Sequence, residues 1–334
     1  MSSHKTVLVT GATGFIGYHA AKRLVAEGHR VRALVRDGDR AAKILGPIVQ
    51  SPDALTVGDM TDGDAVGRAL EGCDAVIHAA ASVSVTSGKT DFSVNLRGTE
   101  TVVGHACERG LYTIFLSSMT AIFDPTIEIT GDSPLVRSRT HYGRSKAECD
   151  KWVRVRQAAG APVATVYPTG VVGPDDPGWS ESVKAYRSFL RGTLKSEGGN
   201  QLVDARDLAH LLCRMIEDET RGRVVAGGHF FDWDEFTALI ERVTGATISR
   251  IQAPGWLLRG GARTMDVIGK LTGRTMPMTG EGIEIATRFA PLQDSPVVED
   301  LGVQWRPANE TLEDLFRWYI ATGRLPAKAA PKLG

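Results

Sequence analysis

Two side chains one helical turn apart give the first indication of chemistry in this sequence. Tyr142 stands four residues before Lys146, and residues at this spacing lie on one face of a helix. A neighbouring ammonium favours the phenolate and moves the tyrosine pKa down from about 10. The pair is therefore suited to moving a proton to and from a substrate oxygen.

A pair of serines offers a place for that oxygen. Ser117 and Ser118 follow an apolar run that ends at Leu116, and residues at the carboxyl end of a buried parallel strand face the ligand. We predict that Ser118 holds the substrate oxygen while a hydride passes to or from the adjacent carbon. An alignment on Phe123 would put Met119 in this place, but the apolar run fixes where the strand ends.

Three glycines near the start of the chain predict a nucleotide site. They follow the apolar run Thr6–Val9 at a spacing of three residues. The pattern predicts a strand, a tight turn and a helix N-terminus, whose N–H groups and dipole can face a pyrophosphate. The absence of Cβ atoms allows the close approach. The residues that we expect to bind the nucleotide here are Gly11, Thr13, Gly14, Phe15, Ile16 and Gly17.

The end of the second predicted strand indicates which nicotinamide cofactor binds. A carboxylate about 20 residues beyond the glycines would bind the ribose diol of NAD, but Val35 and Arg36 stand there. An arginine can pair with a 2′-phosphate or stack on adenine. We therefore predict NADP, and NAD becomes the better interpretation if Asp37 faces the ribose.

A strand-end motif further along is a candidate adenine contact. Asp59 and Met60 follow Gly58, and the Asp59 carboxylate could accept a hydrogen bond from the adenine amino group. The alternative is that Asp59 or Thr61 caps a helix.

Small side chains end the fourth predicted strand. Ala79, Ala80 and Ala81 would let a dinucleotide lie against the backbone. His78 lies inside the apolar run before them, and we interpret it as a buried core histidine rather than a catalytic one.

The alternation of short apolar strands with helical segments predicts an α/β fold with a doubly wound parallel sheet. In the first crossover the helix spans Gly17–Glu27 and ends at Gly28. A helix is also predicted over Ala205–Asp218. The predicted strands are Thr6–Val9, Val31–Val35, Ala54–Val57, Ala75–His78, Thr113–Leu116, Val163–Tyr167 and Arg223–Ala226.

From Thr6 to about Pro174 the chain resembles the extended, or complex, short-chain dehydrogenases/reductases. It is most similar to the branch of dihydroflavonol-4-reductases and cinnamoyl-CoA reductases. The motifs are Thr10–Gly17, Val31–Asp37 and Phe115–Ser118, followed by Tyr142 and Lys146. The resemblance implies a Rossmann fold and a catalytic set of Ser118, Tyr142, Lys146 and Asn95. It also implies nicotinamide contacts at Tyr167, Pro168, Gly170 and Val171, besides cofactor contacts of Tyr142 and Lys146.

The rest of the chain is expected to form a substrate lobe. We predict a nucleotide-binding domain over residues 1–174, joined by 201–228, and a smaller lobe over 175–200 and 229–334. Aromatic and aliphatic residues in this lobe, such as Trp179 and Phe189, favour an NADP-dependent oxidoreductase acting on an apolar or aromatic carbonyl or alcohol.

Two alternatives stay open at this point. The first is a sugar-nucleotide epimerase or dehydratase with retained NAD, because Arg187, Arg191 and Lys195 offer basic groups. The second is an enzyme related to 3β-hydroxysteroid dehydrogenases, because Trp256–Leu271 can form an amphipathic surface helix.

Composition excludes several classes of partner. The 334 residues carry 39 Lys+Arg and 39 Asp+Glu, so the zero net charge provides no general field for nucleic acid. No apolar stretch reaches the ~20 residues of a membrane span, and no signal-peptide core is evident. The four cysteines are scattered without metal-site spacing. We expect a cytoplasmic enzyme with a small-molecule substrate and no metal, and a homodimer stays open.

Overall fold

A seven-stranded parallel sheet forms the centre of the protein. The structure is a computed structural model that describes residues 4–49, 51–83, 91–138, 140–252, 254–261, 264, 283, 286–288 and 291–334. The strand order is β10-β6-β5-β4-β1-β2-β3. The strands are β1 (Thr6–Thr10), β2 (Arg30–Val35), β3 (Leu55–Val57), β4 (Ala75–His78), β5 (Tyr112–Leu116), β6 (Val163–Pro168) and β10 (Gly222–Ala226). The predicted doubly wound sheet is therefore confirmed.

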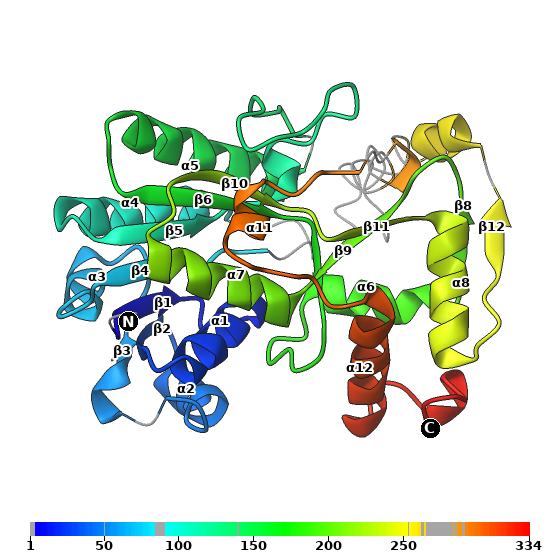
Figure 1. Ribbon diagram of the computed structural model, residues 1–334, viewed down its shortest axis with the longest axis horizontal. Coiled ribbons are helices and arrows are strands. Elements are labelled where there is room, and N and C mark those ends of the chain that lie inside the picture. Colours follow the sequence, from blue (N-terminus) through cyan, green and yellow to red (C-terminus); the bar gives the residue numbers. More distant parts are fainter. Residues whose placement is uncertain are drawn as a thin grey trace.

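Helices cover both faces of this sheet (Figure 1). On one face α1 and α7 lie against each other with α2 beside them, and on the other face α3, α4 and α5 follow in order. Their bounds are α1 (Phe15–Ala26), α2 (Gly38–Leu45), α3 (Gly63–Ala69), α4 (Ser93–Glu108), α5 (His141–Ala158) and α7 (Ala205–Asp218). This arrangement brings the carboxyl ends of the central strands to one edge, where ligands of such sheets bind.

The first crossover follows the predicted pattern closely. Buried Ala20, Ala21 and Leu24 on α1 pack into the main core. Gly28 has a φ of +86° and lies directly after the C-cap residue Glu27. Only a residue without a Cβ adopts this left-handed conformation freely, which explains why the helix ends there.

The later part of the chain builds two small sheets beside the central one. One contains β7 (Gly170–Val172), β9 (Gly199–Asp204) and β11 (His229–Asp232), and the other contains β8 (Thr193–Lys195) and β12 (Arg250–Gln252). Longer helices here are α6 (Glu181–Phe189), α8 (Trp233–Thr244) and α12 (Ala308–Ala321), with the short helix α11 (Val297–Asp300). Single 3₁₀ turns are η1 (Pro52–Ala54), η2 (Met119–Ala121) and η3 (Ala327–Ala329).

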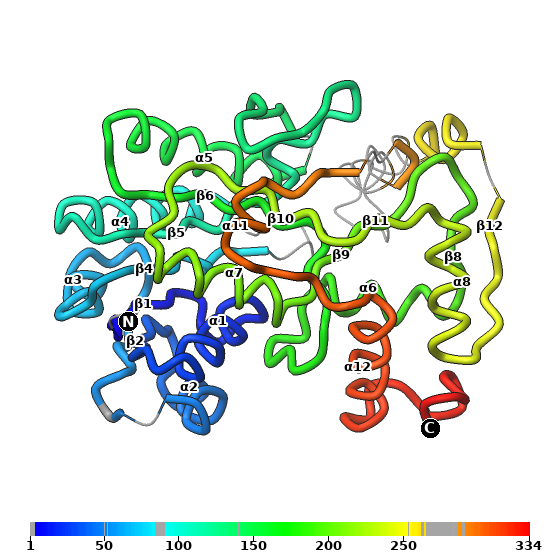
Figure 2. The backbone as a smooth tube through the Cα atoms, viewed as in Figure 1, coloured from blue at the N-terminus to red at the C-terminus, as the bar shows by residue number. Residues whose placement is uncertain are grey.

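The backbone path shows how this part is tied to the sheet. In Figure 2 the chain leaves the central sheet after β6 and returns through β9 into α7. We predicted helices and irregular segments after Asp232, and strand β12 is an addition to that prediction. Among the described residues, no helix is both long enough and apolar enough to cross a bilayer.

A buried histidine links the sheet to α4. His78 is 1% exposed, and its Nδ1 lies 2.8 Å from Thr10 Oγ1 while its Nε2 lies 3.2 Å from Thr99 Oγ1. Burial, reinforced by the Lys146 ammonium, lowers the pKa of His78 to about 3. The prediction of a core histidine with satisfied ring nitrogens is confirmed.

This histidine should make stability depend on pH. The folded protein resists protonation of His78, whereas the unfolded chain takes up a proton below pH ~6.5, so stability falls as the pH falls through that value. From pH 7.5 to 5 the loss attributable to His78 should be about 2 kcal/mol. Urea unfolding of His78→Asn should show a correspondingly flatter dependence than the wild type. Equal slopes for the two proteins would contradict this assignment.

Candidate functional site

The glycine turn after β1 forms a tight cradle against the end of β4. Gly11 has a φ of +74°, and a Cβ there would lie 2.7 Å from the backbone nitrogen of Ala80. A Cβ on Gly17 would lie 2.2 Å from the Gly11 carbonyl oxygen. Both positions therefore need glycine, the first for its conformation and for close contact with β4, and the second for packing α1 on the turn.

The helix that follows presents unpaired backbone donors. Gly14 is the N-cap of α1 and provides no side-chain cap, so the first-turn N–H groups of Phe15, Ile16 and Gly17 gain no side-chain acceptor. Thr13 and Gly14 are partly exposed beside them. Such a helix start attracts an anion. This cradle therefore fits the pyrophosphate of a dinucleotide.

The end of β2 is organised around a capping carboxylate. Asp37 is the N-cap of α2, and its Oδ1 accepts a hydrogen bond from the Arg40 backbone N–H at 2.9 Å. Arg36 is exposed immediately after β2. One oxygen of this carboxylate is thus engaged by its own helix, and the exposed Arg36 guanidinium belongs to the residue before it.

The candidate adenine residues lie in the loop after β3. Asp59 accepts hydrogen bonds from the Thr61 backbone N–H and hydroxyl, which lower its pKa, as does the nearby Arg36. A Cβ on Gly98 would meet the Met60 side chain at 2.6 Å, so Met60 packs on α4. The alternative that Asp59 or Thr61 caps the next helix is wrong, because Asp62 caps α3. Ala79, Ala80 and Ala81 are partly exposed at the end of β4.

The candidate catalytic groups meet at the carboxyl end of β5. Thr140 caps α5 by accepting a hydrogen bond from the Gly143 N–H, which places Tyr142 in the first turn. The Ser118 side chain lies close enough to the Tyr142 phenol to act on its pKa. Ser118 itself follows β5 and accepts hydrogen bonds from Thr120. The strand alignment is supported over the alternative, because Met119 is buried in η2.

The electrostatics of this pair differ from the sequence prediction. Burial raises the pKa of Tyr142 to about 12, with only the Ser118 side chain acting in the lowering direction. The Lys146 ammonium donates to the Leu116 carbonyl at 2.7 Å, and burial lowers the Lys146 pKa. The expected downward shift of the tyrosine pKa is therefore absent from this arrangement, because the phenol is desolvated and the ammonium is bonded to the strand.

Asn95 lies on α4 beside the same helix. Its amide donates to Ser145 Oγ at 3.0 Å and to the Ser82 carbonyl, and its Oδ1 accepts from the Ser82 N–H at 2.6 Å. Asn95 therefore joins the loop after β4 to the residue that precedes Lys146. The structure thus brings the four candidate catalytic residues to neighbouring positions at the ends of β4 and β5.

The residues after β6 that we predicted to contact the nicotinamide differ in how exposed they are. The Tyr167 side chain is fully buried, and its hydroxyl bonds to Asp150 and Arg154 on α5. Pro168 and Val171 are also buried, and only Gly170 is partly exposed. The phenol of Tyr167 is thus directed into the protein, so only its backbone is left for a cofactor contact.

Sequence reasoning missed the acidic member of that buried group. Asp150 is fully buried and lies one turn after Lys146 on α5. Extending the four-residue spacing of Tyr142 and Lys146 by one more step would have reached it. An aspartate on the buried face of a helix was the available signal, since such a residue needs partners.

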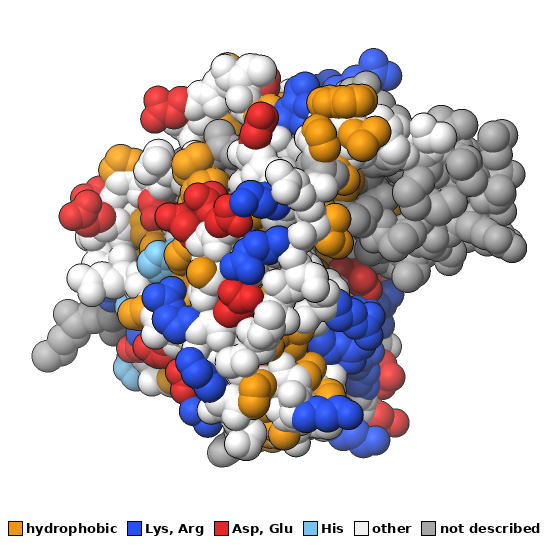
Figure 3. All heavy atoms as spheres, turned by 90° about the vertical axis from the view of Figure 1, so that its right-hand side faces the viewer, with side chains coloured by type: hydrophobic (Ala, Val, Ile, Leu, Met, Phe, Trp, Pro, Cys, Tyr) orange, Lys and Arg blue, Asp and Glu red, His pale blue; other side chains and the backbone are white. Residues whose placement is uncertain are grey.

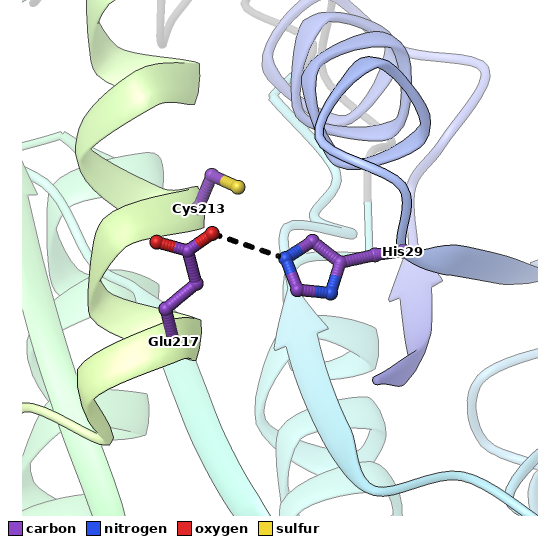
Figure 4. Close-up of side chains that lie close together, drawn as sticks. All are labelled: His29, Cys213 and Glu217. Atoms are coloured by element: carbon purple, nitrogen blue, oxygen red, sulfur yellow. Dashed lines mark hydrogen bonds and ion pairs between the residues drawn. The ribbon is translucent and has the colours of Figure 1, made fainter. Parts of the chain in front are cut away.

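One further cluster has the composition of a metal site. The Nε2 of His29, the Sγ of Cys213 and a carboxylate oxygen of Glu217 lie within 4.8 Å of one another (Figure 4). His29 Nδ1 accepts the Lys5 N–H at 3.1 Å, so the neutral ring carries its proton on Nε2, directed at Glu217. Burial also raises the pKa of the Cys213 thiol to about 12. These features oppose metal binding, which needs a nitrogen lone pair and a thiolate.

Comparison with known proteins places this site in a family. Residues 7–227 match the model of the NAD dependent epimerase/dehydratase family. A putative dihydroflavonol 4-reductase from Synechocystis sp. is 26% identical over 330 residues, and the alignment covers 93% of this chain and 93% of that protein. A 3-beta-hydroxysteroid dehydrogenase from Mycolicibacterium neoaurum is 26% identical over 278 residues, covering 75% of this chain and 74% of that protein.

A solved structure shows the same fold. UDP-glucose 4-epimerase from Bifidobacterium longum, in complex with NAD+ and UDP, has a TM-score of 0.69 at 18% identity, covering 95% of this chain and 99% of that chain. The predicted resemblance is therefore confirmed. The chain belongs to the NAD dependent epimerase/dehydratase family of the extended short-chain dehydrogenases/reductases, and it is an NAD(P)-dependent enzyme of the oxidoreductase type.

Proposed function

We propose that this protein is an NADP-dependent oxidoreductase that interconverts an apolar or aromatic carbonyl compound and its alcohol. The observation that carries the proposal is the proximity of the Tyr142 phenol to Ser118, with Lys146 one helical turn further along α5. A phenol whose pKa is raised to about 12 keeps its proton at neutral pH. This is the state from which a proton can be donated to the substrate oxygen.

The cofactor site is proposed from the cradle after β1 and the strand ends beside it. Gly11, Gly14 and the first turn of α1 would hold the pyrophosphate. Arg36 would pair with the 2′-phosphate of NADP, because Asp37 is occupied by Arg40. The Bifidobacterium relative binds NAD+, so the preference for NADP depends on Arg36.

The residues act on the substrate oxygen in two ways. The Ser118 hydroxyl hydrogen-bonds that oxygen, and Tyr142 donates its proton to it as negative charge develops. A bound NADPH supplies the hydride that the carbon receives. Lys146 lies one helical turn from the phenol, and a protonated ammonium there would stabilise the phenolate that remains after proton transfer.

An apolar cluster that includes Met119, the residue after Ser118, supports the proposed substrate class. Met119 and Leu292 are buried in one cluster, and Phe123 and Phe230 pack against it while keeping part of their surface exposed. This wall suits an aromatic or aliphatic substrate better than a charged one. A steroid-like alcohol falls within this class, and the Mycolicibacterium relative is named for such an activity.

The outer face of the proposed lobe also carries apolar side chains (Figure 3). Ile251, Trp256 and Leu257 are exposed by 56%, 69% and 53%. Residues 255–261 are helical, in agreement with the start of the predicted surface helix. Its continuation over residues 265–271 lies outside the described residues.

A sugar-nucleotide epimerase is less well supported. Two of the basic groups that would favour a diphosphate have partners within the proposed lobe. Arg187 donates to the Arg324 carbonyl at 3.0 Å, and Lys195 lies 3.6 Å from Asp234. A diphosphate would have to compete with these contacts.

The proposed division of the chain has the nucleotide-binding domain over 1–174 and 201–228 and the substrate lobe over 175–200 and 229–334. All seven strands of the central sheet fall in the first set, which supports the division. Strands β8, β11 and β12 fall in the second set, and the β7-β9-β11 sheet joins the two.

The cofactor proposal predicts a selective loss in Arg36→Ala. Removing one charge-assisted contact costs ~1.5–3 kcal/mol, so NADPH should bind roughly 10- to 100-fold more weakly, while NADH binding changes little. Arg40→Ala is the matched control, because it keeps the backbone N–H that donates to Asp37. It should weaken NADPH binding less than Arg36→Ala does. Fluorescence titration measures both cofactors. A wild type that binds NADH as tightly as NADPH would overturn this proposal.

The catalytic proposal predicts that Tyr142→Phe lowers turnover by ~10²–10⁴-fold with cofactor binding retained, because the substrate oxygen loses its proton donor. The measurement is NADPH consumption with a reducible aromatic ketone. Tyr112→Phe is the control, since this tyrosine donates to the Thr220 carbonyl from the opposite end of β5. It should reduce stability and leave turnover near the wild-type value. Full turnover in Tyr142→Phe would end the assignment.

A further inference from the structure

A buried polar group fastens α5 to the two strands beneath it. We call it the Asp150 cluster, and it consists of Ser117, Asp150, Arg154 and Tyr167. The Asp150 carboxylate accepts from Ser117 Oγ at 2.9 Å, from Arg154 Nε at 3.0 Å and from the Tyr167 hydroxyl at 3.1 Å. Arg154 also donates to the Tyr167 hydroxyl at 3.0 Å. The group thus joins α5 to β5 and β6.

The cluster is an unusual choice for stability alone. The Asp150 side chain is 0% exposed and that of Arg154 is 19% exposed. Burying an ion pair costs about as much free energy as it returns, and apolar residues of similar volume often stabilise a fold as well. Three side chains nevertheless donate hydrogen bonds to the buried Asp150 carboxylate, so several residues are placed specifically to bind it. A role in fixing geometry or charge explains that construction better than a role in stability.

The spacing along α5 connects this cluster to the catalytic pair. Tyr142, Lys146 and Asp150 follow one another at four-residue intervals. They contact three consecutive residues at the end of β5, since Tyr142 meets Ser118, Lys146 meets Leu116 and Asp150 meets Ser117. A shift of α5 along β5 would break all three contacts together.

We propose that Asp150 is a positioning residue, which holds α5 in register with β5 and keeps the neighbouring Lys146 charged, with Arg154 limiting the size of that charge effect. This inference rests on the proposed roles of Tyr142 and Lys146. It assigns the cluster to the proton-transfer step, although none of its members touches the substrate.

The charges around Lys146 determine in which direction each substitution should shift the pKa of the Tyr142–Lys146 pair. Burial lowers the Lys146 pKa, whereas Cys149 and Asp150 act in the opposite direction. His78 faces Lys146 from β4 and is neutral, and burial raises the pKa of Tyr167 on β6, so that residue also stays uncharged. Asp150 and Arg154 are the two charged members of the Asp150 cluster, and a substitution can remove each charge separately.

Two substitutions should move the acid–base step in opposite directions. Asp150→Asn removes a negative charge and should lower the apparent pKa of the coupled Tyr142–Lys146 pair by about one unit. Arg154→Gln removes a positive charge and should raise it by a similar amount. The measurement is the pH profile of kcat/KM for alcohol oxidation by the whole protein. The pH dependence of NADPH binding gives a second readout. Shifts in the same direction, or no shift in either variant, would overturn the proposal.

Ser117→Ala controls for loss of packing and hydrogen bonding, since it removes one donor to Asp150 and leaves both charges in place. It should lower stability without a comparable pKa shift. If Asp150→Asn does not fold, the comparison of Arg154→Gln with Ser117→Ala decides, and equal profiles for these two variants would refute the proposal. Failure of the catalytic assignment is recognised separately, because Tyr142→Phe would then retain full turnover.

Discussion

The hydrogen bond from the Lys146 ammonium to the Leu116 carbonyl sets the position of α5 on the central sheet. It is 2.7 Å long and buried. A buried ammonium must find acceptors, and the last residue of β5 provides one where the strand ladder stops. With Lys146 held there, Tyr142 reaches Ser118 one turn earlier along the helix. The positions of Tyr142 and Lys146 thus depend on a hydrogen bond that the ammonium needs because burial has removed its water.

Burial disfavours the charged form of both members of the pair, so it shifts their pKa values in opposite directions. It raises the pKa of the Tyr142 phenol and lowers that of the Lys146 ammonium, so each neutral form is favoured. A protonated phenol is the form that donates to a developing alkoxide. Deprotonation of the phenol, which alcohol oxidation requires, is therefore helped by added positive charge beside it. An oxidised nicotinamide is a charge of that kind.

The sequence allowed the central strands, the glycine turn and the placement of Tyr142 and Lys146 on one helix to be predicted because each follows from a local pattern. Apolar runs marked the strands, and only glycine fits at Gly11 and Gly17. Contacts between distant segments were not predictable in this way. The phenol of Tyr167 turns towards Asp150 rather than the cofactor side, and Asp62 rather than Asp59 caps α3. In both cases several neighbouring residues could serve, and tertiary packing decided between them.

The transfer of deuterium from NADPH labelled at nicotinamide C4 distinguishes a reductase from an epimerase with retained cofactor. The protein would be mixed with labelled NADPH and an aromatic ketone, and the products analysed by mass spectrometry. Our account predicts label on the carbinol carbon, with one NADP+ released into solution for each alcohol formed. The contradicting result is a protein that purifies with stoichiometric NAD, does not exchange it, and transfers no label to any ketone of this class.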